Sequence, residues 1–128
     1  MQDQPTPSEV LGAVALFLKT VVAAETTGAT SFQARVAANA LEMMKRELEL
    51  SPAEDAAELA RLKSLLGEDG DLTELNRHLA EQIAGGTLDL TTPGLKDHLW
   101  ATTLAELAVD QPTYAAYRAS VAERGSKE

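Results

Sequence analysis

Three short stretches carry the same kind of signal for the start of a helix, and they constrain the fold more than any other feature of the sequence. Each places Thr, Ser or Asp three residues before a Glu, so that each side chain can satisfy a backbone N–H of the other residue. These stretches are Thr6 to Glu9, Ser51 to Glu54 and Asp71 to Glu74. Weaker signals stand at Thr92-Pro93 and at Asp110 to Pro112. Together they predict helix starts near 7, 52, 72, 93 and 111.

Apolar residues recur with helical spacing after these start signals. The first stripe consists of Val10, Leu11, Val14, Leu18, Val21 and Val22. The segment after Asp71 has the same spacing at Leu72, Leu75, Leu79 and Ile83. No segment alternates apolar and polar residues for long enough to found a sheet. The sequence therefore predicts an all-α fold, a bundle of about six helices with short connections.

The length of the chain, 128 residues, is that of one ordinary domain. We therefore expect a single helical domain over 1–128. The ends, 1–5 and 124–128, lack apolar periodicity and are expected to fray.

Charge and composition limit the partners and the compartment. A formal net charge of -9 would repel phosphate backbones and anionic membranes, so no nucleic acid is expected. No apolar run is expected to span a membrane, and no basic and apolar export signal opens the chain. The absence of cysteine fits a reducing cytoplasm, where we expect the protein. Residues 51–90 hold nine acids against three bases, which indicates a solvated surface or, as the alternative, an acidic docking face.

The stretch Ser31 to Leu50 combines a strong helix with polar residues set among alanines. Helical projection puts Arg35 and Asn39 on one side, where the small neighbours would let a ligand or another backbone approach closely. A planar guanidinium in such a groove suits a carboxylate or a phosphate. Arg35 and Asn39 are therefore the predicted ligand-binding residues. The alternative interpretation is an ordinary solvated face.

A second group of polar residues is predicted to be buried. In the same projection Glu47 lies within the apolar arc of its helix, and Asn76 lies beside an apolar stripe. A buried carboxylate must pair, accept hydrogen bonds or stay protonated. We therefore predict a polar network that fixes helix register, with Arg77 and Tyr114 as further members. A catalytic acid at Glu47 is the alternative.

Other chemistry finds little support in the residues. His78 and His98 are expected at the surface, and neither follows an acid by three residues, as a carboxylate-bridged di-iron bundle requires. Zinc ligation is not expected from two histidines without cysteine. Gly85-Gly86 lacks the Gly-Lys-Ser/Thr sequence of a phosphate loop. We predict no catalytic residue, no metal and no cofactor.

Short motifs spread over nearly the whole chain carry a family resemblance. They are Asp3 and Pro5, Arg35 to Leu41, Arg46 to Leu48, Leu75 to Arg77, and Leu107 to Asp110 with Pro112 and Tyr114. In these motifs the chain resembles an uncharacterised family of short bacterial proteins that is described as a domain of unknown function. Genes of that family often lie beside aminoglycoside-phosphotransferase-like kinases and acyl-CoA dehydrogenases. The resemblance thus implies a setting and no activity.

Three hypotheses about function follow. The leading one is a non-enzymatic accessory or binding protein that works with a phosphotransferase-like or acyl-CoA-metabolising partner enzyme. The second is a small helical enzyme or anion-binding module in which Arg35, Asn39 and Glu47 line a pocket. The third is a purely structural homodimer that uses whatever apolar surface the first helix leaves uncovered.

Overall fold

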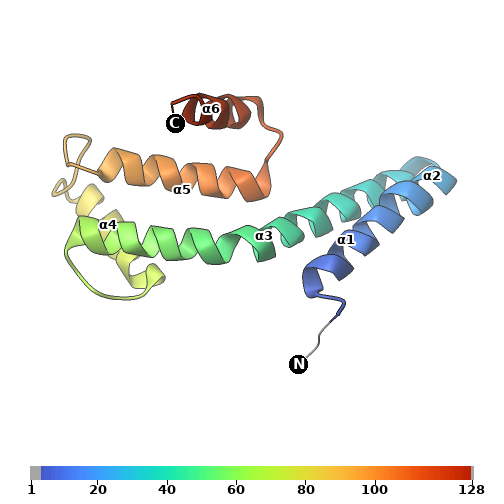
Figure 1. The fold of residues 1–128 in the computed structure, drawn as a ribbon, viewed down its shortest axis with the longest axis horizontal. Helices are drawn as coiled ribbons and strands as arrows, with labels where there is room; N and C mark the ends of the chain where they lie inside the picture. The colour runs from blue at the N-terminus through green and yellow to red at the C-terminus, as the bar shows by residue number, and fades with distance from the viewer. Residues whose placement is uncertain (1–3, 128) are drawn as a thin grey trace. The chain divides into compact units, whose positions relative to one another are not determined.

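The computed structural model describes residues 4–127, and all regular structure in that range is helical (Figure 1). The first helix runs as α1 (Pro7–Phe17), a π-helical turn η1 (Leu18–Val22) and α2 (Ala23–Glu25). The remaining helices are α3 (Gly28–Leu66), α4 (Leu72–Ala84), α5 (Leu95–Asp110) and α6 (Ala115–Gly125). The predicted all-α fold is confirmed.

The helix starts predicted near 7 and 72 are confirmed, and both use the expected reciprocal hydrogen bonds. At α1 the Glu9 N–H donates to Oγ1 of Thr6 at 3.2 Å, and the Thr6 N–H donates to Oε2 of Glu9 at 2.7 Å. At α4 the Glu74 N–H donates to Oδ1 of Asp71 at 2.9 Å, and the Asp71 N–H donates to Oε2 of Glu74 at 3.3 Å. These local bonds satisfy backbone donors that a helix start otherwise leaves open.

Helix α3 explains why residues 4–127 form five continuous helices where about six were expected. The start predicted near 52 is wrong, because α3 runs through Ser51-Pro52 without interruption. Pro52 lacks the N–H that would bond the carbonyl of Leu48, but α3 continues past this position to Leu66. A cap signal starts a helix only where the preceding helix has already ended. No glycine stands directly before Ser51 to end the helix there.

The last two helices begin later than the starts predicted near 93 and 111. Helix α5 begins at Leu95, after Gly94 adopts a left-handed conformation with φ of 86°. A side chain at Gly94 would be strained in that conformation. Helix α6 begins at Ala115, after a turn in which the Tyr114 N–H donates to the carbonyl of Gln111 at 3.1 Å.

The chain divides into two compact units, one up to Leu50 and one from Ser51 onward, and α3 contributes to both. The single domain over 1–128 stays a prediction. Of the ends expected to fray, 1–3 and 128 lie outside the described residues. Arg124 and Gly125 are helical, contrary to expectation, because α6 continues to Gly125.

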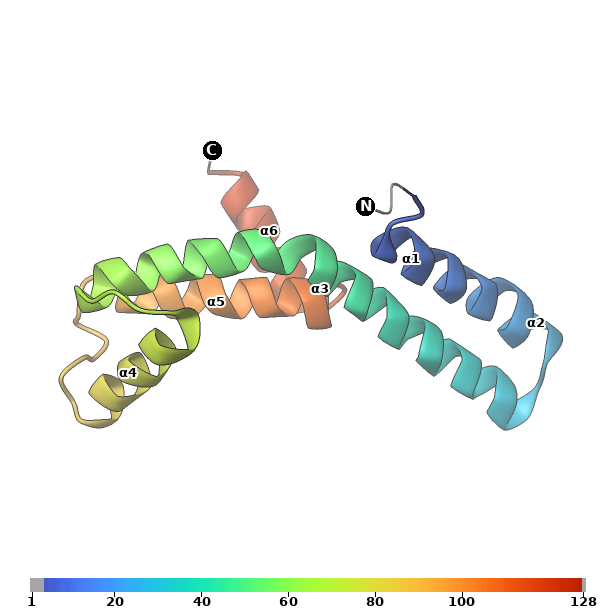
Figure 2. The same ribbon diagram turned by 90° about the horizontal axis from the view of Figure 1, so that it is seen from below.

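The first unit is an antiparallel hairpin of α1 to α2 against the first part of α3 (Figures 1 and 2). Four contacts join the two arms along their length. Ser8 hydrogen-bonds Glu49, Gly12 lies against the side chain of Lys45, Nζ of Lys19 lies 2.8 Å from Oε1 of Glu42, and Oγ of Ser31 donates to the carbonyl of Ala23 at 2.7 Å. These pairs run in opposite order along the two arms, as an antiparallel hairpin requires.

Small residues form the fully buried part of this hairpin, and several large apolar residues stay exposed. The buried residues are Ala15, Ala23, Ser31, Ala34 and Ala38. The outer side of α1 and η1 carries the α1 stripe, which we define as Val10, Val14, Phe17 and Val21, with exposed fractions of 36 to 54%. The first part of α3 carries the α3 stripe, Phe32, Val36, Met43 and Leu50, with exposed fractions of 36 to 63%. Close backbone approach therefore contributes to holding the hairpin together, while the two stripes remain exposed.

The second unit has a core of leucines. Leu62 of α3, Leu75 and Leu79 of α4, and Leu95 of α5 are buried together. Partly buried leucines surround them at 59, 65, 66, 72 and 88. Helix α5 lies alongside the second part of α3 in both views, and α6 follows α5 (Figures 1 and 2). Burying these four leucine side chains from three helices stabilises the unit by several kcal/mol, at about 1.5 to 3 kcal/mol each.

Candidate functional site

Arg35 and Asn39, the predicted ligand-binding residues, lie exposed on α3 in the first unit. Neither side chain makes a hydrogen bond or an ion pair with another residue in the range 4–127. Neither lines the two hollows described below. The structure therefore leaves both side chains exposed to solvent.

The buried network predicted around Glu47 is wrong. Glu47 is exposed on α3, because α1 packs against the opposite side of α3, where Ala34 and Ala38 are buried. The first unit therefore leaves the predicted apolar arc uncovered, and the carboxylate on it stays in water. An exposed carboxylate needs no partner, so Glu47 carries no register-fixing role within this unit.

The other predicted network members have separate partners. Nδ2 of Asn76 donates to Oε1 of Glu58 at 2.7 Å. Nη1 of Arg77 donates to Oε1 of Glu81 at 2.9 Å, and Nη2 of Arg77 lies 3.3 Å from Nε2 of His78. Tyr114 precedes α6 with a side chain that is 51% exposed. Asn76 is thus the one member with a half-buried polar contact, and its partner lies on α3 of the second unit.

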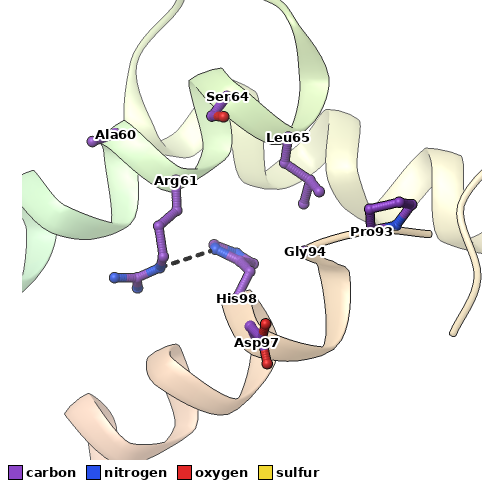
Figure 3. Close-up of a pocket in the computed structure, with 8 residues that line it drawn as sticks. All are labelled: Ala60, Arg61, Ser64, Leu65, Pro93, Gly94, Asp97 and His98. Atoms are coloured by element: carbon purple, nitrogen blue, oxygen red, sulfur yellow. Dashed lines mark hydrogen bonds between the residues drawn. The ribbon is translucent and has the colours of Figure 1, made fainter. Parts of the chain in front are cut away.

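A hollow lies in the second unit, where α3 and α5 pack together (Figure 3). Its volume is about 510 Å³. Its lining residues are Ala60, Arg61, Ser64, Leu65, Pro93, Gly94, Asp97 and His98. The walls combine apolar side chains with a guanidinium, a hydroxyl, a carboxylate and an imidazole, which is the mixture typical of small-molecule sites.

His98 is the buried polar residue of this hollow, with an exposed fraction of 3%. The expectation of a surface histidine is wrong, because His98 lies one helical turn after the buried Leu95, on the face of α5 that packs against α3. Nε of Arg61 donates to Nδ1 of His98 at 3.4 Å, as the dashed line in Figure 3 marks. This geometry requires an imidazole with an unprotonated Nδ1.

Burial lowers the pKa of His98 below its ordinary value of 6.5, and the positive charge of Arg61 lowers this pKa further. The carboxylate of Glu58 acts in the opposite direction but does not cancel the other two effects. The neutral imidazole is therefore favoured at pH 7. Arg61 and His98 can lie together because only one of them is charged.

A second hollow of about 350 Å³ also borders Arg61. It lies among α3, α5 and α6, and its polar lining consists of Glu54, Arg61, Tyr117 and Arg124. Arg61 is the residue common to both hollows.

Arg61 and His98 were not predicted as site residues, because they lie 37 positions apart and belong to different helices. One signal was present in the sequence: His98 falls between Leu95 and Thr102 with helical spacing, so it shares their face. No corresponding signal marks Arg61, because arginines commonly lie beside a leucine stripe, at the edge of the apolar face of a helix.

No group of three or more His, Cys, Asp or Glu side chains within 4–127 is placed to hold a metal ion.

The helical stretch Pro7–Glu25 is long and apolar enough to cross a membrane by length and composition, with a mean hydropathy of 1.5. Helices of soluble proteins and signal sequences also meet this criterion. The sequence argument that no such stretch exists is therefore wrong, and the absence of a membrane partner stays a prediction.

The comparisons with known proteins assign a family without assigning an activity. No curated protein and no solved structure matches the chain. The model of a family described as a domain of unknown function (DUF6285) matches residues 24–114, a range that includes Arg61, Asn76 and His98. Because this match covers well over half of the sequence, the chain belongs to the DUF6285 family.

Proposed function

We propose that the chain is a non-enzymatic accessory protein that binds a partner enzyme through the outer surface of its first unit. The observation that supports this proposal is the exposure of the α1 stripe, in which Phe17 is 54% exposed and Val14 is 42% exposed. Single exposed apolar residues are normal, but regular rows of them are typical of surfaces that bind another protein.

The spacing within the α1 stripe fits helix-to-helix binding. Its residues follow one another at intervals of four, three and four positions. Such intervals keep side chains on one seam when two helices pack side by side. A partner that offers a helical groove or a helix of its own would cover this seam and remove it from water.

The charge of the first unit is compatible with such a partner. Residues 1–50 hold four basic and six acidic residues, a formal charge of -2 out of the -9 of the whole chain. Long-range electrostatic repulsion of a negatively charged partner is therefore weakest at this surface. Burial of apolar area can then dominate the free energy of binding.

The partner that we propose is a phosphotransferase-like kinase or an acyl-CoA dehydrogenase in the bacterial cytoplasm. This identity rests on the setting that the family resemblance implies. Kinases and dehydrogenases supply their own catalytic groups, so the accessory protein would contribute binding, positioning or stability. A nucleic-acid partner is not part of the proposal, given the net acidity of the chain.

Co-purification from the native host tests this proposal. Tagged protein is expected to retain one of the two enzymes, and Phe17→Asp is expected to abolish retention by placing a charge in the α1 stripe. Leu90→Asp is the matched control, because Leu90 is 79% exposed but lies outside the first unit. Recovery of neither enzyme contradicts the proposed partner, even when other proteins are captured. Equal retention by Phe17→Asp and Leu90→Asp contradicts the proposed surface.

A second candidate is a structural homodimer formed by the first unit. Asn39 favours it, because Asn39 lies three residues after Val36 and four before Met43, within the seam of the α3 stripe. Two hairpins can pack as a four-helix bundle, and an asparagine in a seam can pair with its copy and set the register. Sedimentation equilibrium decides this point. A dimer that Asn39→Asp converts to a monomer supports it, and a monomer at micromolar concentration contradicts it.

A further inference from the structure

We propose that the hollow at Arg61 in the second unit binds a small organic molecule with a single carboxylate. This function goes beyond the proposed protein interaction, because it uses different residues and a different unit. The predicted anion site at Arg35 and Asn39 is not required for it.

The guanidinium of Arg61 has open donors. Its Nε–H donates to Nδ1 of His98, and its Nη1 and Nη2 groups make no hydrogen bond or ion pair with the residues 4–127. Arg61 is only partly exposed, so water does not surround its whole side chain. A guanidinium whose two terminal nitrogens are available can hold both oxygens of one carboxylate in parallel.

The acidic residues nearby do not satisfy these donors. Glu58 lies one helical turn before Arg61 and would be its natural partner. Its Oε1 instead accepts a hydrogen bond from Nδ2 of Asn76 at 2.7 Å. Asp97 lines the same hollow but forms no ion pair with Arg61. The arginine is thus left for an external anion.

His98 holds one edge of the guanidinium of Arg61. Its ring is buried and approaches Arg61 from α5, as Figure 3 shows. The contact with Nε restricts the plane of the guanidinium, which reduces the conformational entropy that a ligand must overcome. A partly ordered guanidinium binds a planar carboxylate more tightly than a mobile one.

The lining of the hollow selects the rest of the ligand. Leu65, Pro93 and Ala60 offer apolar contact, and the volume of about 510 Å³ suits a molecule of small organic size. Asp97 and the net charge of -9 disfavour anions with two charges. A carboxylate joined to an apolar group fits these conditions better than phosphate does.

Nuclear magnetic resonance titration with sodium benzoate tests this inference on the full chain at pH 7.5. The expected result is a saturable shift of the Arg61 Nε–Hε signal and of the Ser64 and Asp97 amides. Arg61→Gln is expected to weaken binding by at least about tenfold. Arg118→Gln is the control, because Arg118 is exposed on α6 and lines neither hollow.

Two further arms make the result decisive. Arg61→Lys keeps the charge and loses the parallel pair of donors, so it is expected to bind benzoate more weakly while its amide spectrum stays dispersed. Inorganic phosphate is the second probe and is expected to bind more weakly than benzoate. Shifts that do not saturate, equal benzoate affinity in Arg61→Gln and the native chain, or tighter binding of phosphate would each overturn the inference.

Discussion

Nε of Arg61 donates a hydrogen bond to Nδ1 of His98 over 3.4 Å, which joins α3 to α5 through two basic side chains. This contact persists only while His98 is neutral. Protonation would place a second positive charge beside the guanidinium and remove the acceptor. The packing of these two helices is therefore linked to pH.

The free energy of unfolding is expected to fall as the pH decreases below about 6.5, the pKa of histidine in an unfolded chain. Because the pKa of His98 is lowered in the folded protein, the unfolded chain binds the proton first. Each step toward lower pH then favours unfolding until the folded-state pKa is reached. Urea denaturation between pH 7.5 and 5.5 measures this loss in the free energy of unfolding. The measured loss includes the effects of Arg61 and Glu58 on the pKa of His98.

The control for this pH dependence is a second histidine. His98→Gln is expected to flatten the dependence between pH 7.5 and 5.5, whereas His78→Gln retains the loss due to His98. His78 is a suitable match because it is partly buried and its Nδ1 contacts Glu68 at 2.7 Å. An unchanged slope in His98→Gln would show that another group is responsible.

Asn76→Ala is expected to lower the free energy of unfolding by about 1 to 2 kcal/mol. The substitution removes the donor to Glu58 and leaves a half-buried carboxylate without its partner. Thermal or urea unfolding measures the change. Gln33→Ala, on the exposed surface of α3, is the control and is expected to cost under about 0.5 kcal/mol. Equal effects of the two substitutions would contradict the assigned role of Asn76.

Thr102→Val is expected to leave stability unchanged or to raise it by up to about 1 kcal/mol. Oγ1 of Thr102 is buried and has no hydrogen-bond partner among the described residues, so its hydroxyl costs free energy that a methyl group does not. Thr103→Val is the matched control, because Oγ1 of Thr103 is exposed and donates to the carbonyl of Leu99 at 2.9 Å. A clear loss of stability in Thr102→Val, absent in the control, would mean that the hydroxyl is satisfied in solution.

Glu47→Ala is expected to change the free energy of unfolding by less than about 0.5 kcal/mol, since Glu47 is exposed. Leu62→Ala provides the contrast, because Leu62 is fully buried and its truncation leaves a cavity that costs about 2 to 5 kcal/mol. Differential scanning calorimetry on both variants measures the two effects. A cost near that of Leu62→Ala at Glu47 would restore the buried carboxylate predicted from the helical projection.

The fold class and two helix starts could be predicted because their causes are local. The bonds between Thr6 and Glu9, and between Asp71 and Glu74, join residues three positions apart. Ser51 and Glu54 carry the same signal but lie within α3. Whether such a signal starts a helix depends on whether the preceding helix has already ended. A short pattern does not contain that information.

The candidate site could not be predicted because its geometry depends on which helix faces pack together. Helical projection predicts a buried face around Glu47, yet α1 packs on the small residues Ala34 and Ala38 instead. Periodicity identifies an apolar face but does not say whether anything covers it. The meeting of Arg61 with His98 likewise depends on how α3 and α5 pack, which neither helix encodes alone.

Because the boundary between the two units falls inside α3, this chain offers no natural place to be cut. A break between Leu50 and Ser51 would leave up to four carbonyls on one fragment and four N–H groups on the other without partners. Recombination or truncation at that point would therefore harm both halves. We therefore expect the two units to occur together in related proteins. A search for either unit as an independent domain in other proteins is expected to fail.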